Sequence, residues 1–210
     1  MATNPTGGAH APLIQRVKNI LTTPKTEWPV IDSEPATIGG IYKNYVMILA
    51  AIGPVCGAIG LLLMGGPFFA IPVGYLIAYA VISYLLALAG CYILALIIEA
   101  LAPTFGGTKD RVKAFKVAAY ASTAAWVAGI FGLLPPLAIL ALVGLIYTFY
   151  LMYLGLPVLM KTSADKSVAY TAAIVVAAIV LYLVIGVITS RILFSMMTGP
   201  AATLPVAYPG

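Results

Sequence analysis

The chain has 210 residues, of which 62% are hydrophobic and only 8% are charged. An average soluble domain is about 45–50% apolar and about 25% charged, so this composition excludes a water-soluble globular protein. The formal net charge of +5 is carried outside three long uncharged runs, at residues 44–98, 117–160 and 167–190. Runs of this kind are typical of membrane-spanning helices. We therefore predict an all-α integral membrane protein.

Residues 1–43 are predicted to form a cytoplasmic segment with one amphipathic helix at about 12–22. Its apolar side chains fall within an arc of about 120° at 100° per residue; they are Leu13, Ile14, Val17, Ile20 and Leu21. Arg16 lies on the flank of this arc, where its stem can extend to the interface. The helix is too short to span a bilayer, so it either lies on the membrane surface or docks against the bundle. Thr23-Pro24 ends it, and Trp28 follows at the expected depth of the interface.

The uncharged runs are too long for single spans. A helix of 55 residues, the length of the first run, would extend about 80 Å, whereas the hydrocarbon core is about 30 Å thick. Gly65-Gly66-Pro67, Pro72 and Pro135-Pro136 mark the breaks. The predicted fold is a five-transmembrane-helix bundle with an N-terminal amphipathic interfacial helix, and its spans are about 44–64, 73–98, 114–134, 137–160 and 168–190.

The basic residues predict the orientation. With five spans, ten of the 11 Lys and Arg residues lie on one side of the membrane, and only Arg191 lies on the other. Basic loops remain on the cytoplasmic side. We therefore expect a cytoplasmic N-terminus and an extracytoplasmic, Pro-rich tail at 191–210.

Glu99 is the ionisable residue closest to the interior of a predicted span, and such residues are functional candidates because burying them is costly. One interpretation pairs Glu99 with Arg111 or a nearby lysine. The other places it at the rim of an inward-facing polar vestibule, together with hydroxyl-bearing residues in the cytoplasmic halves of the spans: Tyr92, Tyr120, Thr123, Tyr150, Tyr153, Tyr170 and Thr171. The tyrosines would otherwise form an aromatic belt at the headgroups.

The connection after the second span is predicted to start a helix at Lys109, with Thr108 as its N-cap and Asp110 in its first turn. Lys109, Lys113 and Lys116 recur at helical spacing and form a basic stripe. This stripe either faces anionic lipid or serves only to set the topology.

Small residues four apart predict close helix packing. The clearest pairs are Gly53 with Gly57 and Ala125 with Gly129. They indicate a compact bundle and are compatible with a homo-oligomer. Pro54 lies within the first span and is expected to kink it.

Residues for catalysis are scarce. His10 is the single histidine, so a His-based metal site or catalytic dyad cannot be assembled. Cys56 and Cys91 lie at different depths and are interpreted as packing residues. We expect no catalytic residues, no metal, no cofactor and no nucleic acid.

Several segments together resemble the Yip-one domain family of five-span membrane proteins. They are the amphipathic segment leading to Thr23-Pro24 and Glu27-Trp28-Pro29, the stretch Phe105–Asp110, the stretch Ala114–Tyr120, and the stretch Leu154–Met160. The resemblance covers about residues 12–190 and is closest to short bacterial members. Members often carry a proline a few residues after the position of Tyr120, and this chain has Ser122-Thr123-Ala124-Ala125 there.

The family is named for interaction with Ypt/Rab GTPases, but about 43 residues before the first span leave little room for a GTPase-binding region. For bacterial members the resemblance implies an inner-membrane location. We expect a non-enzymatic membrane protein that organises lipids, above all anionic lipids, or a membrane-protein partner, as a homo-oligomer. The alternative is a small transporter or channel that uses the inward-facing vestibule.

Overall fold

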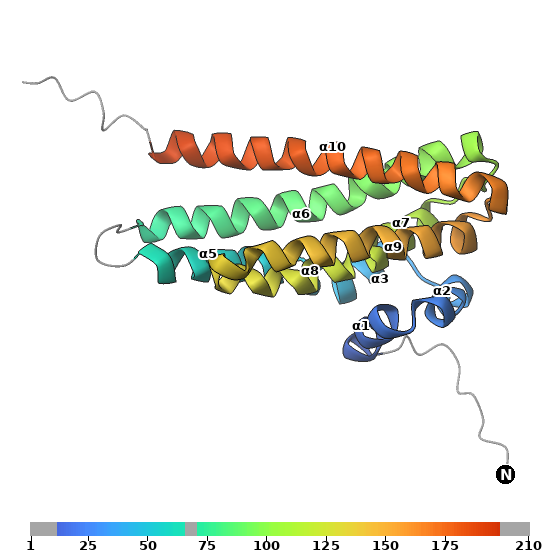
Figure 1. Ribbon diagram of the computed structural model, residues 1–210, viewed down its shortest axis with the longest axis horizontal. Helices are drawn as coiled ribbons and strands as arrows, with labels where there is room; N and C mark the ends of the chain where they lie inside the picture. Colours follow the sequence, from blue (N-terminus) through green and yellow to red (C-terminus); the bar gives the residue numbers. More distant parts are fainter. Residues whose placement is uncertain (1–11, 66–70, 198–210) are drawn as a thin grey trace, which may run out of the picture.

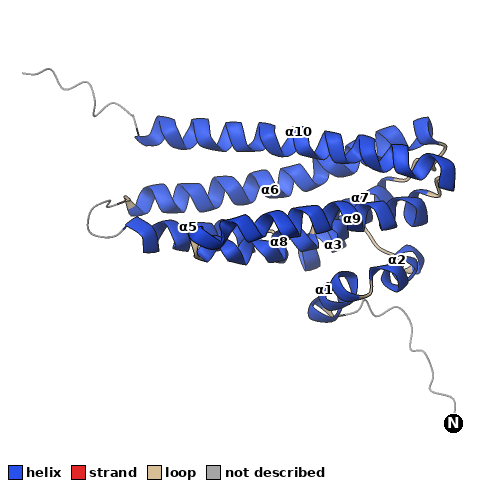
Figure 2. Cartoon of the chain, viewed as in Figure 1, coloured by secondary structure: helices blue, strands red, loops and turns tan. Residues whose placement is uncertain are grey.

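In the computed structural model the chain forms a bundle of five helical spans, with two short helices beside one end of it (Figure 1). The structure describes residues 12–65 and 71–197. Within these residues the regular elements are helices and none is a strand (Figure 2). The prediction of an all-α, five-span membrane protein is therefore confirmed.

The N-terminal helix pair consists of α1 (Leu13–Thr22) and α2 (Pro24–Ser33). The first span comprises α3 (Ile38–Ile41), the π-helical turn η1 (Tyr42–Val46), α4 (Met47–Leu49) and α5 (Ile52–Gly65). The second comprises α6 (Val73–Leu101) and the 3-10 turn η2 (Ala102–Phe105). The third comprises α7 (Arg111–Ala121), α8 (Thr123–Ala128) and the 3-10 helix η3 (Gly129–Leu133). The 3-10 helix η4 (Pro135–Leu140) leads to α9 (Ala141–Met160), the fourth span, and α10 (Ala164–Met197) is the fifth. The tail at 198–210 and the break at 66–70 lie outside the described residues.

Two spans are interrupted for identifiable reasons. The first is broken between Leu49 and Ile52, because Pro54 has no N–H to donate to the Ala50 carbonyl and its ring crowds that residue. The third is broken at Ser122, whose hydroxyl donates to the Ala118 carbonyl at 2.7 Å. A serine bonded back to the preceding turn bends helices. The chain thus breaks this span at a serine.

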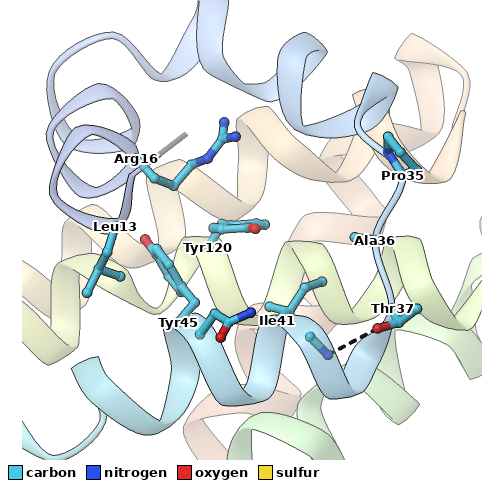
Figure 3. Close-up of a pocket in the computed structure, with 10 residues that line it drawn as sticks. Leu13, Arg16, Pro35, Ala36, Thr37, Ile41, Tyr45 and Tyr120 are labelled. Atoms are coloured by element: carbon cyan, nitrogen blue, oxygen red, sulfur yellow. Dashed lines mark hydrogen bonds between the residues drawn. The ribbon is translucent and has the colours of Figure 1, made fainter. Parts of the chain in front are cut away.

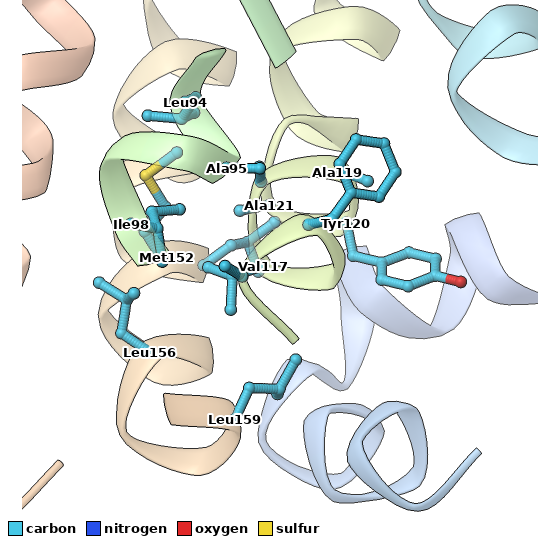
Figure 4. Packing of buried hydrophobic residues seen from close by; sticks show 14 of the residues in the cluster. Leu94, Ala95, Ile98, Val117, Ala119, Tyr120, Ala121, Met152, Leu156 and Leu159 are labelled. Atoms are coloured by element: carbon cyan, nitrogen blue, oxygen red, sulfur yellow. The ribbon is translucent and has the colours of Figure 1, made fainter. Parts of the chain in front are cut away.

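The third span lies at the centre of the bundle. Every residue of α7 from Ala114 to Ala121 is buried, and half of them are alanine. In Figure 4, Leu94 and Ile98 of α6 and Met152, Leu156 and Leu159 of α9 surround this segment. The most apolar stretch of the third span is 67% buried, against 17% for the fifth. The alanines of α7 therefore allow its neighbours to pack closely around it.

Glycines bring the first and third spans into backbone contact. A Cβ on Gly129 would lie 2.7 Å from the Cα of Gly53, and one on Gly60 would lie 2.0 Å from the carbonyl oxygen of Gly132. The backbone N–H of Ala125 donates to the Thr148 hydroxyl of α9 at 3.1 Å. The small residues that predicted close packing thus contact other spans of the same chain.

The charged residues collect at one end of the bundle. Figure 1 shows the helix pair, the α6–α7 connection and the α9–α10 connection at this end, which we call the basic end. It carries ten of the 11 Lys and Arg residues. The opposite end, where α5 finishes and α6 begins, is called the far end, and it carries Arg191.

Candidate functional site

The helix pair is held against the basic end by a buried tryptophan. The Trp28 side chain is fully buried, and it packs on Gly155 of α9 so closely that a Cβ there would lie 2.7 Å from the indole ring. The Tyr147 hydroxyl donates to the Leu21 carbonyl at 2.8 Å. Trp28 was expected at the membrane interface, but it is a core residue. Of the two positions considered for the helix at 12–22, the structure shows the docked one.

A buried cluster of charges joins the two short helices. The Arg16 guanidinium of α1 donates to Glu27 of α2 and to Glu34, which follows α2. Asn19 donates to the second oxygen of Glu27 at 3.1 Å. The guanidinium also lies 5.8 Å from the centroid of the Tyr120 ring of α7, within the range of a cation–π interaction. Arg16 therefore points inward and does not extend to the interface as expected.

Two lysines of α7 hold the end of α2. The Lys116 ammonium is buried and donates to the carbonyls of Ile31 and Glu34, each at 2.6 Å. Lys113 lies 3.0 Å from Asp32, which also pairs with Lys161 at 2.6 Å. Carbonyls at a helix C-terminus lack hydrogen-bond donors within the helix. Lys116 therefore provides the donors for these two carbonyls. Of the predicted basic stripe, Lys116 faces the helix pair, while Lys109 is exposed and Lys113 is half-buried.

We call the contact region between the helix pair and the basic end the dock. The charge states of Arg16 and Asp32 in it follow from these pairs. Burial opposes the charge of Arg16, but the hydrogen bond and charge of Glu34, together with the charge of Glu27, raise the pKa of the guanidinium above its ordinary value. Burial would likewise raise the pKa of Asp32, yet its hydrogen bonds and charge interactions with Lys161 and Lys113 hold it below the ordinary value. Both groups are therefore charged at neutral pH.

A cavity of about 400 Å³ lies between the helix pair and the first span (Figure 3). It is lined by Leu13, Arg16, Pro35, Ala36, Thr37, Gly40, Ile41, Asn44, Tyr45 and Tyr120. Tyr45 belongs to the π-helical turn η1; its ring packs edge-on against Tyr120, and its hydroxyl lies 2.6 Å from that of Thr123. The volume falls within the usual range for small-molecule sites. Its wall combines guanidinium, amide and phenol groups with apolar side chains, which suits an amphiphile.

Glu99 forms the ion pair that the sequence suggested. The Arg111 Nε donates to Glu99 Oε2 at 2.8 Å, across the connection between the second and third spans. The Glu99 side chain is 10% exposed, whereas that of Arg111 is 54% exposed. The pair therefore ties the end of the second span to the start of the third at a level that water reaches.

The residues of the predicted vestibule are dispersed. Tyr120 lines the cavity beside the helix pair, but Tyr92 packs against Phe115. The Tyr170 hydroxyl donates to the Ile98 carbonyl inside the bundle. Tyr150 and Tyr153 are exposed, at 40% and 45%, as an aromatic belt would be. Tyr120 is the member of this set that lines the cavity beside the helix pair, and Glu99 is not among the residues that line that cavity.

The connection between the second and third spans is a tight turn. Phe105 stacks on Tyr170 with ring centroids 5.1 Å apart, and Gly106 has φ +72°, which favours glycine. The N–H of Thr108 donates to the Met160 carbonyl at 2.7 Å. The N-cap of α7 is Asp110, whose side chain accepts from the Lys113 N–H at 3.0 Å. The expected cap, Thr108, instead fastens the connection to the end of α9.

The sequence did not reveal Arg16, Glu27 and Glu34 as one cluster. Glu27 and Glu34 are seven residues apart, a spacing that places two residues on the same side of a helix. Arg16, which lies beside the apolar arc of the preceding helix, was the cation available to pair with them. Recognising this required knowing that the two short helices fold against each other.

The arrangement defines a class: a five-span helical membrane protein with a helix pair docked on one end of its bundle. The profile of the Yip1 domain matches residues 18–187, from within α1 to within α10. The chain belongs to the Yip1 domain family, and the resemblance seen in its sequence is confirmed. A search of curated proteins and a search of solved structures each found no match.

Proposed function

We propose that this Yip1-domain protein is a non-enzymatic, oligomeric organiser of anionic lipids in a bacterial inner membrane. The basic end carries the proposal. Around the docked helix pair it exposes lysines from several segments, namely Lys18, Lys25, Lys43, Lys109, Lys161 and Lys166. A basic residue close to an anionic surface contributes about 1 kcal/mol of attraction. A membrane-protein partner with an acidic surface would be drawn to the same end.

The dock gives these lysines fixed positions. Lys18 and Lys25 lie on α1 and α2, which the Arg16–Glu27 pair joins to each other and which Trp28 holds to the bundle. Lys43 lies at the start of the first span, close to the cavity-lining Asn44. Headgroups attracted to these lysines would therefore meet the opening of an amphiphile-sized cavity. Attraction by charge and accommodation by shape would act at one place.

The lipid preference is tested by native mass spectrometry of the protein from nanodiscs that contain phosphatidylglycerol and phosphatidylethanolamine. We expect the wild-type protein to retain phosphatidylglycerol in several-fold excess over its share of the mixture. The variant Lys18→Gln/Lys25→Gln/Lys43→Gln should lose most of this excess. The matched variant with three Lys→Arg changes should keep it, because the charges remain. An unchanged excess in the Gln variant would contradict the proposal.

The orientation is tested separately. The basic end is expected to be cytoplasmic, so Ser163→Cys at the α9–α10 connection should be protected from an impermeant thiol reagent in intact cells. Pro136→Cys, which is exposed near the far end, should react. The two native cysteines would first be replaced by alanine. Labelling of Ser163→Cys in intact cells would reverse the orientation.

The oligomer is tested in membranes. The glycine contacts of the first and third spans are used within the chain, so self-association would involve α10, the least buried span. Cysteines introduced one at a time at Val176, Val180 and Leu183, which are exposed on α10, should form interchain disulfides on mild oxidation. A monomer at every position would refute the oligomeric part of the proposal.

A further inference from the structure

The lipid-facing surface of the second span stops short of the basic end. On α6, the exposed large apolar side chains of the described chain extend from Val73 to Ile93. At about 1.5 Å per residue this stretch measures about 30 Å, which is about the thickness of the hydrocarbon core. After Ile93 the helix continues to Leu101, and Ile98 and Glu99 are buried there. The last turns of α6 therefore lie outside the hydrocarbon.

The same boundary can be located on the first and fourth spans. On the first span, the exposed side chains change from Lys43 and Asn44 to Met47 and Ile48 within about one turn. On α9, Tyr150 is 40% exposed, and exposed tyrosines are typical of the headgroup level. The hydrocarbon therefore begins between Asn44 and Met47 on the first span and near Tyr150 on the fourth.

Helix α1 connects these two points of the boundary. Its Leu13 lines the same cavity as Asn44 of the first span. At its other end, the Leu21 carbonyl accepts from the hydroxyl of Tyr147, which lies about one turn before Tyr150 on α9. In Figure 1, α1 lies beside the bundle and closer to the far end than α2. The helix therefore lies across the first and fourth spans at the edge of the hydrocarbon.

Helix α1 has three sides with different surroundings. The first contains Arg16 and Ile20 and is buried in the dock. The second is polar and exposes Gln15 and Lys18. The third is apolar and recurs at i, i+3 and i+7, a spacing that places residues on one side of a helix; it consists of Ile14, Val17 and Leu21. Ile14 is 82% exposed, and the other two are half-buried. The dock therefore leaves this apolar side partly uncovered.

We propose that α1, while docked on the bundle, also lies in the headgroup layer of the adjoining leaflet, with Ile14 inserted among the phospholipids at the level of their ester groups. The leaflet is the occupant of the apolar side because this side adjoins the lipid-facing surface that begins at Met47 and Ile48. Lys18, one turn from Ile14, then lies at the level of the phosphates. The ends of the spans beyond α1 form a headpiece outside the hydrocarbon. The insertion of Ile14 requires no anionic headgroup and is therefore independent of the proposed lipid preference.

Nitroxide spin labels test the proposal in vesicles of phosphatidylcholine, which offer the lysines no anionic lipid. Each protein would carry one label, at Ile14→Cys or at the matched control Gln15→Cys, with Cys56 and Cys91 replaced by alanine. Both labelled positions are exposed on α1, so the labels leave the dock intact. Collisions with oxygen, which concentrates in hydrocarbon, and with a water-soluble nickel chelate would be measured. We expect the ratio of oxygen to nickel collisions to be several-fold higher at Ile14→Cys than at Gln15→Cys.

The level of the boundary is tested with the same labels on α6. The label at Leu85→Cys should collide mainly with oxygen and the label at Ala100→Cys mainly with nickel, since both positions are exposed on either side of Ile93. Equal ratios at the two positions of α1 would overturn the proposal, as would a ratio at Ala100→Cys that matches Leu85→Cys. A label at Ile14→Cys that neither reagent reaches would show that a second copy covers this side, and would also overturn it. Because the vesicles lack anionic lipid, failure of the phosphatidylglycerol preference would leave these results unchanged.

Discussion

The two ends of this bundle are built in different ways. At the basic end, two connections and the helix pair are tied together by ion pairs, by side chains that bond carbonyls, and by Trp28 against α9. In the far half, contact between spans depends on glycine backbones, and the outer part of α10 leaves a groove beside α6. Charged groups that water and headgroups can reach are cheap to keep near the interface and costly deep in the core. The basic end can therefore be specified by polar contacts, whereas the far half must rely on shape.

The largest effect is expected at the tryptophan of the dock. Trp28→Ala removes a fully buried indole, and Trp→Ala changes in cores cost about 3–5 kcal/mol. We expect the helix pair to detach while the five spans stay folded, so trypsin should cleave at Lys18 and Lys25 much faster in inverted vesicles. Trp126→Ala, on half-buried α8, should leave this cleavage slow. Slow cleavage in Trp28→Ala would mean that polar contacts alone hold the pair.

A similar loss is expected when the buried cation is removed. Arg16→Met strands the buried carboxylate of Glu27, and breaking a buried pair costs about 3–5 kcal/mol. Adding Glu27→Gln should restore part of that loss, because the more deeply buried carboxylate is then no longer left without its cation, while Glu34, whose side chain is 23% exposed, keeps its charge. A double-mutant cycle on the apparent melting temperature measures the coupling. Strictly additive effects would show that the two groups do not interact.

The far half should be sensitive where its backbones touch. Gly60→Ala places a methyl group where only 2.0 Å separates it from the Gly132 carbonyl. Overpacking of this kind costs about 1–3 kcal/mol. Gly74→Ala, whose methyl group meets open space, is the control. Equal melting temperatures for the two variants would show that the far half is loosely packed throughout. The two halves would then differ in packing more than these contacts indicate.

The pair at the start of the third span is expected to contribute less. Glu99→Gln removes one charge of a pair whose arginine is 54% exposed, and pairs that water reaches are worth about 0–1 kcal/mol. The melting temperature should fall only slightly, and Arg111→Gln should behave the same way. A loss as large as that of Arg16→Met would place Glu99 in a dry site.

The smallest effect is a dependence on pH. The pKa of Asp32 is below its ordinary value of 3.8 in the folded protein, so its contribution to stability is fully present above that value. It is lost as the pH falls through the lower, native pKa. The melting temperature should therefore decline below about pH 4, and this decline should be smaller in Asp32→Asn. Identical pH profiles would show that Lys113 and Lys161 do not stabilise the dock through Asp32.

The spans could be predicted because the cost of burying charge dictates where uncharged runs must cross a membrane. Pro54 also predicted a break correctly, since a missing N–H acts locally. The site was harder to predict. Whether Arg16 turns inward or outward depends on Glu27 and Glu34, which reach it only after two helices fold together, and Lys116 could be placed only once α2 was known to end beside it. Thr108 and Asp110 are both good caps, and the choice between them depends on Met160, from a distant span.

The burial of Trp28 also makes the dock visible by optical spectroscopy. The chain has two tryptophans, and Trp126 lies on α8, part of a different span. An indole shielded from water emits at shorter wavelength than one in contact with it, so release of the helix pair would shift the emission of Trp28 to the red. With Trp126 replaced by phenylalanine, the remaining signal would come from the dock alone. The protein thus contains a native fluorophore that reports whether its helix pair is docked.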